Sequence, residues 1–199
     1  MAFTKDKRRR ISNESYLDAL QEKYSKLCVV RVDLEYAKNS ETNKVEITLN
    51  EANKHISRLL NNRRNNEIFD HNIGYLIKTE YGEDRNVHFH SFFFYDGQKV
   101  QKDIIKGEDI GKYWSKNITN GTGTYYNCNR NDYKEKHAIG ILDYRDAKKR
   151  RNLDYAMAYL VKEDQSIEAL KENEKDRIIR RGTLPKEKST RGRPRNQLY

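Results

Sequence analysis

Several segments alternate between apolar and polar residues, the pattern of a β-strand with one buried face. In the first of them, valines and leucines alternate with Arg31, Asp33 and Glu35. Two of the others flank the turn-forming residues 82–86 and therefore predict an antiparallel hairpin. The predicted strands cover residues 27–36, 73–81, 87–95, 121–127 and 138–144.

Between these segments, apolar residues recur at helical spacing, as Ile56, Leu59 and Leu60 do. Ser12 is a candidate N-cap for the first helix. The predicted helices cover about residues 13–26, 50–68, 104–114, 147–162 and 166–181. Helices interspersed with strands and a hairpin predict an α+β fold, with an antiparallel sheet covered by helices mainly on one face. The other face would be available for chemistry.

The 199 residues suit one domain with appendages, and the net charge of +10 lies mostly at the ends. Residues 1–10 carry five basic side chains and one acidic, and residues 166–199 carry ten basic and five acidic. We therefore predict a basic arm at 1–10, a folded domain at 11–165 and a charged helix with a basic tail at 166–199. Such ends suit phosphate binding, although charged tails can also serve solubility alone.

The remaining composition points to a cytoplasmic protein. Cys28 and Cys128 are far apart and match no zinc or redox spacing, so we expect reduced packing residues. No apolar stretch follows the basic start, which predicts that there is no signal peptide, and no segment approaches the length of a membrane span.

Two histidines occupy alternate positions in the strand predicted at 87–95. His88 and His90 therefore share one face of that strand. If paired residue numbers in the hairpin sum to an even value, Glu80 lies opposite His88 on the same face, whereas a one-residue slip removes it. Two imidazoles and a carboxylate suit Mg²⁺ or Mn²⁺, and zinc would also tolerate them. The alternative is two ordinary polar residues on a solvated strand face.

The predicted helix at 147–162 carries Tyr155 and Tyr159 four residues apart, hence on one face, with Lys162 at a neighbouring position. A phenol with a pKa of about 10 is a poor nucleophile near neutral pH. A metal that polarises a phosphate makes its attack feasible, and a nearby ammonium can balance the developing charge. The alternative is packing, because the chain contains 14 tyrosines.

The histidine pair followed by the tyrosine helix resembles the HUH endonuclease superfamily of rolling-circle replication initiators. More closely, the chain is similar to the inovirus gene II replication-protein family of the YagK/YfjJ type, over about residues 27–195. The motifs that carry this similarity are Arg31-Val32-Asp33-Leu34, Gly74-Tyr75, Glu80-Tyr81-Gly82, His88-Phe89-His90, Asp96-Gly97 and Tyr159-Leu160-x-Lys162-x-x-Gln165.

The resemblance implies an RRM-like HUH fold, with the histidines on a middle strand and the tyrosines on a helix facing them. It implies a divalent metal held by His88 and His90, with Glu80 as the third ligand. By position, Tyr159 corresponds to the nucleophile and Tyr155 to the extra tyrosine of two-tyrosine members. The implied activity is cleavage of single-stranded DNA at a replication origin, giving a 5′-phosphotyrosine and a 3′-hydroxyl that primes synthesis.

Clusters of basic residues are the candidate DNA contacts outside the site. Arg191-Gly192-Arg193-Pro194-Arg195 resembles an AT-hook core that enters the minor groove, although a basic tail making unspecific phosphate contacts is an equal alternative. The other candidates are Arg8, Arg9, Arg10, Lys148, Lys149, Arg150 and Arg151. We expect single-stranded DNA with flanking duplex as the partner, and a host helicase because no ATPase motif is visible.

The leading hypothesis is therefore a metal-dependent enzyme that nicks and rejoins DNA to initiate rolling-circle replication of a phage or prophage-like element. A DNA-binding regulator on the same fold that no longer cleaves is one alternative, and a hydrolytic metallonuclease is another. Transposition and plasmid transfer use the same chemistry as replication initiation.

Overall fold

The computed structural model describes residues 5–160, 167, 170–171 and 177–185. Its helices are α1 (Lys5–Lys23), α2 (Leu49–Asn62), α3 (Asp103–Tyr113) and α4 (Ala147–Leu160). Its strands are β1 (Lys26–Tyr36), β2 (Asn72–Gly82), β3 (Asn86–Asp96), β4 (Gly123–Asn127), β5 (Gly140–Asp143) and β6 (Ile179–Arg181). A π-helical turn, Trp114–Ile118, extends α3, and short 3₁₀ turns lie at Arg63–Asn65, Glu67–Phe69, Cys128–Arg130 and Lys134–Lys136.

The strands form one open sheet in the order β4-β1-β3-β2-β6, and β5 pairs with the other half of β1. All of these pairings are antiparallel. The chain order β1-α2-β2-β3-α3-β4, with β1 and β3 in the centre, is consistent with an RRM-like fold. The α+β class and the antiparallel sheet predicted from the sequence are confirmed.

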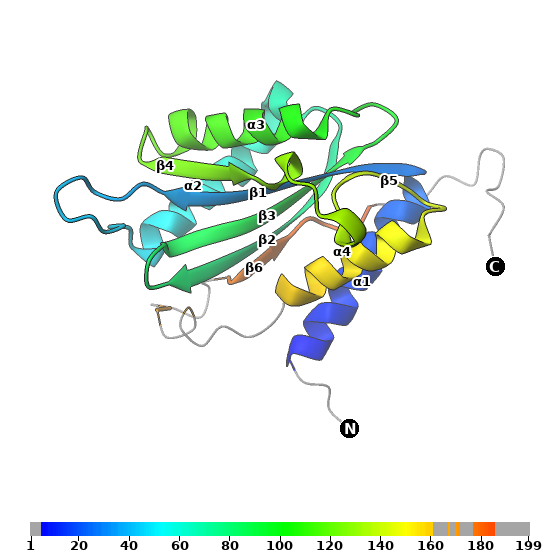
Figure 1. Cartoon of the computed structure of the whole chain (residues 1–199), viewed down its shortest axis with the longest axis horizontal. Coiled ribbons are helices and arrows are strands. Elements are labelled where there is room, and N and C mark those ends of the chain that lie inside the picture. The colour runs from blue at the N-terminus through cyan, green and yellow to red at the C-terminus, as the bar shows by residue number, and fades with distance from the viewer. Residues whose placement is uncertain (1–4, 161–166, 168–169, 172–176, 186–199) are drawn as a thin grey trace.

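Helices α2 and α3 cover one face of the sheet; in Figure 1, α3 lies above the strands and α2 lies behind them. Alternate residues of β1 and β3, such as Val32 and Phe89, pack there with Ile56 of α2 and Trp114. Helix α2 begins with a capping box, in which Thr48 and Glu51 each hydrogen-bond the backbone N–H of the other. The faces of β1 and β3 opposite the histidines are thereby buried in an apolar core.

Helices α1 and α4 pack on the other face, over one end of it (Figure 1). Tyr16 of α1 and Leu153 of α4 contact the same apolar cluster as Phe92 and Phe94 of β3. Because side chains alternate along a strand, the next two positions on this face are His90 and His88. The helices thus cover the rows of Phe92 and Phe94, and the histidine rows continue beyond them toward the β2–β3 turn.

Three predicted boundaries are wrong. The helix predicted over about 50–68 ends at Asn62, and 3₁₀ turns at Arg63–Asn65 and Glu67–Phe69 take the place of its last part. Helix α1 begins at Lys5 and not near Asn13, because residues 5–10 contain good helix formers and no helix breaker. Ser12 is therefore inside the helix. The end of the helix predicted at 166–181 is instead strand β6, which adds to the edge of β2. The proposed division at residues 10 and 165 stays a prediction.

The two cysteines, Cys28 and Cys128, are both buried and free, as expected for packing residues. Burial raises the pKa of each thiol to about 12.

None of the helices that the structure describes has the length and apolar character needed to cross a membrane.

The contact of α3 with β4 provides a test of this fold. A Cβ added at Gly111 would overlap the ring of Tyr125. We expect Gly111→Ala to lower the free energy of unfolding by about 1–3 kcal/mol through overpacking, despite alanine's better helix propensity. Urea denaturation measures this change. The exposed neighbour Lys112 is the control, since Lys112→Ala should stay within about 0.5 kcal/mol of the unchanged protein. Equal stability of all three proteins would contradict the described packing of α3.

Candidate active site

The pairing of β2 with β3 brings the predicted ligands together. Glu80 lies opposite His88, and Lys78 lies opposite His90. The predicted even-sum register is therefore correct. Since paired residues share a face, all four side chains are on the sheet face that also carries Phe92.

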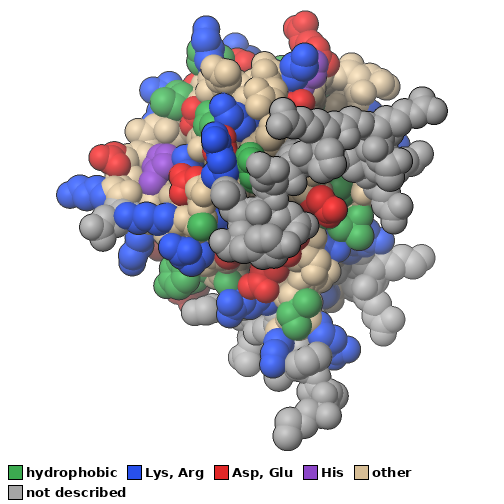
Figure 2. All heavy atoms as spheres, turned by 90° about the vertical axis from the view of Figure 1, so that its right-hand side faces the viewer, with side chains coloured by type: hydrophobic (Ala, Val, Ile, Leu, Met, Phe, Trp, Pro, Cys, Tyr) green, Lys and Arg blue, Asp and Glu red, His purple; other side chains and the backbone are tan. Residues whose placement is uncertain are grey.

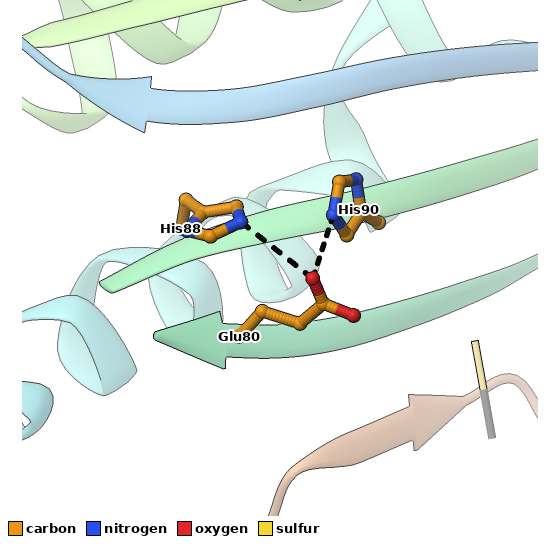
Figure 3. A group of neighbouring side chains, drawn as sticks. All are labelled: Glu80, His88 and His90. Atoms are coloured by element: carbon orange, nitrogen blue, oxygen red, sulfur yellow. Dashed lines mark hydrogen bonds and ion pairs between the residues drawn. The ribbon is translucent and has the colours of Figure 1, made fainter. Parts of the chain in front are cut away.

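The two imidazoles and the carboxylate converge on one point (Figure 3). The Nε2 atom of His90 is 3.0 Å from Oε2 of Glu80, and Nε2 of His88 is 3.7 Å from the same oxygen. One ligand atom from each residue lies within 4.8 Å of the others. This group can hold a metal ion.

The hydrogen bonding of His88 supports that assignment. Its Nδ1 atom is 3.0 Å from the carbonyl oxygen of Asn86, and a carbonyl only accepts, so Nδ1 carries the proton. Nε2 then presents a lone pair toward the Glu80 carboxylate, is buried, and makes no hydrogen bond with any described residue. A buried lone pair facing a carboxylate calls for a cation between them, as in metal sites where a histidine's second nitrogen is fixed by a carbonyl.

Two further charged residues contact this group, and the sequence analysis did not assign either of them to it. Asp33 of β1 lies opposite His90, with its Oδ1 3.0 Å from Nδ1 of that ring, a close ion pair although not an aligned hydrogen bond. The buried Lys78 donates from Nζ to Oε1 of Glu80 at 2.5 Å. The even-sum register of the hairpin already implied that Lys78 shares the face of the histidines. The position of Asp33 could be predicted only from the pairing of β1 with β3.

The ionisation of this group follows from its contacts. Burial alone would raise the pKa of Glu80, but the adjacent His88 ring and the hydrogen bonds with His90 and Lys78 outweigh burial and hold that pKa well below its usual range. Burial alone would also raise the pKa of Asp33, but the contact with His90 outweighs burial and lowers that pKa. Burial would lower the pKa of His90, whereas Asp33 and Glu80 together raise it to about 9. Without a metal, His90 is therefore the cation between two carboxylates.

The tyrosine helix lies over the same face. Tyr155 and Tyr159 project from α4 with exposed fractions of 72% and 60%. Both line a cavity whose floor includes Phe92, two residues beyond His90 on β3. In Figure 1, α4 runs toward the end of the sheet where β2 ends. The structure thus places the two phenols beside the metal-binding face, and their catalytic roles stay predictions. Lys162 lies outside the described residues.

The predicted DNA-binding residues differ in their surroundings. Lys148 and Arg151 are exposed, and Lys149 is partly buried. Arg150 joins α4 to α1 through an ion pair with Asp18 at 2.8 Å, and it also pairs with Asp154 of α4 at 3.0 Å.

The N-terminal candidates lie in α1. Arg10 pairs with Glu14 at 2.8 Å, whereas Arg8 and Arg9 line a basic hollow with Arg181. On the face shown in Figure 2, lysines and arginines are interspersed with carboxylates. Arg191, Arg193 and Arg195 lie outside the described residues.

The comparisons with known proteins identify a family. The model of the family described as the YagK/YfjJ C-terminal domain matches residues 8–166, which is most of the chain. Searches of curated proteins and of solved structures each gave no significant match. The matched region includes the Glu80-His88-His90 group and all of α4.

Metal binding should stabilise the folded protein, because the three ligands converge only in the native state. With Mn²⁺ at about a hundredfold excess over its Kd, we expect about 2.7 kcal/mol of added stability, measured as a rise in Tm. Glu80→Gln should lose most of that rise. The control is Glu83→Gln, since Glu83 is exposed in the adjacent turn. The same rise in all three proteins would place the ion elsewhere.

The metal-free protein should lose stability at alkaline pH. The pKa of His90 is raised from 6.5 to about 9 by Asp33 and Glu80 against the effect of burial, so its protonated form favours folding. That contribution is fully present below about pH 6.5 and is lost as the pH rises through about 9. Thermal denaturation with a chelator, across this window, measures the loss. His90→Gln should abolish it, whereas His71→Asn, at an exposed position with a φ of 64°, should not.

Proposed function

This chain belongs to the YagK/YfjJ C-terminal domain family, and from its metal-binding group we propose that it is a metal-dependent, site-specific nickase of the HUH type. The proposed enzyme cleaves and rejoins single-stranded DNA through a 5′-phosphotyrosine, initiating rolling-circle replication of a phage or prophage-like element. The similarity of its motifs to inovirus gene II replication proteins supports this reading.

One observation carries the proposal: the buried Nε2 of His88, which has no hydrogen bond among the described residues, faces Glu80 on the sheet face over which the tyrosine helix packs. Metal-dependent cleavage of nucleic acid uses a cation that binds phosphate oxygens and a nucleophile beside it. Glu80, His88 and His90 supply ligands for the first, and α4 supplies exposed phenols for the second.

A divalent ion, Mg²⁺ or Mn²⁺, would supply Lewis-acid polarisation of the scissile phosphate. Asp33 holds the His90 ring from its Nδ1 side, so that Nε2 stays directed at Glu80. Lys78 binds the other oxygen of Glu80 and fixes the carboxylate. These contacts hold the ligands in place before DNA arrives.

In the proposed reaction, the Tyr159 oxygen attacks phosphorus, and the bond between phosphorus and the 3′ oxygen breaks. The phenol loses one proton, and the departing 3′ oxygen gains one to become the 3′-hydroxyl. The phosphodiester energy is retained in the phosphotyrosine, so a later 3′-hydroxyl can reverse the joining without ATP. Tyr155 lies one helical turn away for a second transfer, and Lys162 would balance the developing charge.

The proposed partners follow from this chemistry. Single-stranded DNA at a replication origin is the substrate, and exposed Lys148 and Arg151 contact its phosphates or the flanking duplex. A host helicase would unwind the duplex, in the cytoplasm of a bacterial cell.

A covalent adduct tests the proposal. Incubation with Mn²⁺ and a labelled pool of random single-stranded DNA should give a denaturation-resistant protein–DNA band that a chelator prevents. Tyr159→Phe should abolish the band, because only a phenol oxygen can form the ester. The matched control is Tyr144→Phe, another exposed tyrosine, which should leave it unchanged.

Other outcomes separate the alternatives. A band lost in Tyr155→Phe but kept in Tyr159→Phe would reverse the assignment of the nucleophile. Cleaved DNA without an adduct would indicate a hydrolytic metallonuclease. Bound DNA with neither cleavage nor adduct would indicate a regulator on this fold.

A further inference from the structure

A cavity of about 620 Å³ lies between the sheet and α4, within the size range of small-ligand pockets. Arg31 of β1 and Phe92 of β3 line it from the sheet. Tyr133 and Ile139 line it from the segment between β4 and β5, and Leu160 lines it from α4. It is therefore walled by flat and aliphatic side chains, which favours a flat, largely apolar guest.

The position of this cavity ties it to the candidate active site. Phe92 follows His90 by two residues on the same strand face, a separation of about 7 Å along the strand. Tyr155 and Tyr159 line the α4 side of the cavity. A strand of DNA with one phosphate at the Glu80-His88-His90 group would thus bring an adjacent base to this cavity.

The charged side chains that line the cavity within the described residues are cationic. Arg31 and Lys136 line it, and no carboxylate is among its lining residues in the described parts of the chain. The Arg31 guanidinium lies 5.5 Å from the centre of the Phe92 ring. Its Nε is 3.5 Å from Asp33, is buried, and makes no hydrogen bond with any described residue. The cavity therefore offers donors against an aromatic floor, and a guest that supplies acceptors fits it.

We propose that this cavity binds one unpaired nucleobase of the substrate strand, next to the cleaved bond, and that it prefers guanine. Guanine presents two acceptors, O6 and N7, on one edge, and the two parallel N–H donors of an arginine side chain match them. Adenine presents only one acceptor there, N7, beside its N6 amino donor. The ring walls provide stacking, which all bases share. This inference rests on the proposed function, because it takes single-stranded DNA as the ligand.

The test is binding without metal, so that it does not depend on cleavage. Fluorescence anisotropy compares a short labelled oligothymidylate with the same strand carrying one central dG or one central dA, and with an abasic strand. We expect the dG strand to bind about fivefold or more tightly than the oligothymidylate, and the abasic strand to bind most weakly. Equal affinities for all four strands would overturn the proposal.

Two variants locate the effect. Ala156→Phe fills the cavity from α4 and should remove the preference for dG, whereas Ala158→Phe, the same change on the same helix outside the cavity lining, should keep it. Arg31→Lys keeps the charge without the planar fork, so it should lower the affinity for dG to that for dA. A dG preference that survives in Ala156→Phe, with Tm showing that the variant is folded, would overturn the proposal.

The two proposals can fail separately. A dG preference that depends on the cavity, in a protein that forms no covalent adduct, supports the base site and refutes the nickase. An adduct with no base preference in the binding assay supports the nickase and refutes the base site.

Discussion

The pairing of β2 with β3 is the constraint on which the site depends. Its register sets Glu80 against His88 and Lys78 against His90, and a shift of one residue would turn Glu80 to the opposite face. The dry core beneath holds that register, because Val87, Phe89 and Phe93 alternate with the histidines and are fully or almost fully buried. The Glu80-His88-His90 group is thus fixed by apolar packing on the opposite side of the sheet.

Contacts between charged side chains further fix the position of the His90 ring. His90 lies between Asp33 on one neighbouring strand and Glu80 on the other, at 3.0 Å from each. Both central strands are needed for this arrangement, since β1 supplies Asp33 and β3 supplies the ring. In the absence of a metal, the protonated ring neutralises the two acids, and a bound cation would take over that role at Nε2 while Asp33 keeps the ring oriented. The same β1 face continues to Arg31, which lies over Phe92 in the cavity beside α4. The metal-binding group and the cavity are therefore consecutive rows of one sheet face.

Most of the secondary structure could be predicted from local patterns. The strands β1, β2 and β3 match the predicted segments to within one residue at either end. Helix α1 was predicted to start too late although residues 5–10 are good helix formers, and β6 was predicted as a helix because its strand conformation depends on pairing with the edge of β2. The contacts of Arg150 with α1 could not be predicted, because its ion pair with Asp18 and its hydrogen bond to Gln21 join positions more than a hundred residues apart in the chain.

By itself, the sequence determined that His88 and His90 share a face, that Glu80 can stand opposite them, and that Tyr155 and Tyr159 share one side of a helix. Each of these follows from the repeat of a single strand, hairpin or helix, which backbone geometry sets over a few residues. Only the tertiary structure decided that β1 lies beside β3, that α4 packs over Phe92, and that Asp33 and Arg31 therefore join the histidine face. Those contacts join residues far apart in the chain, and they depend on the order of the strands and the packing of the helices. A local sequence repeat encodes neither of these.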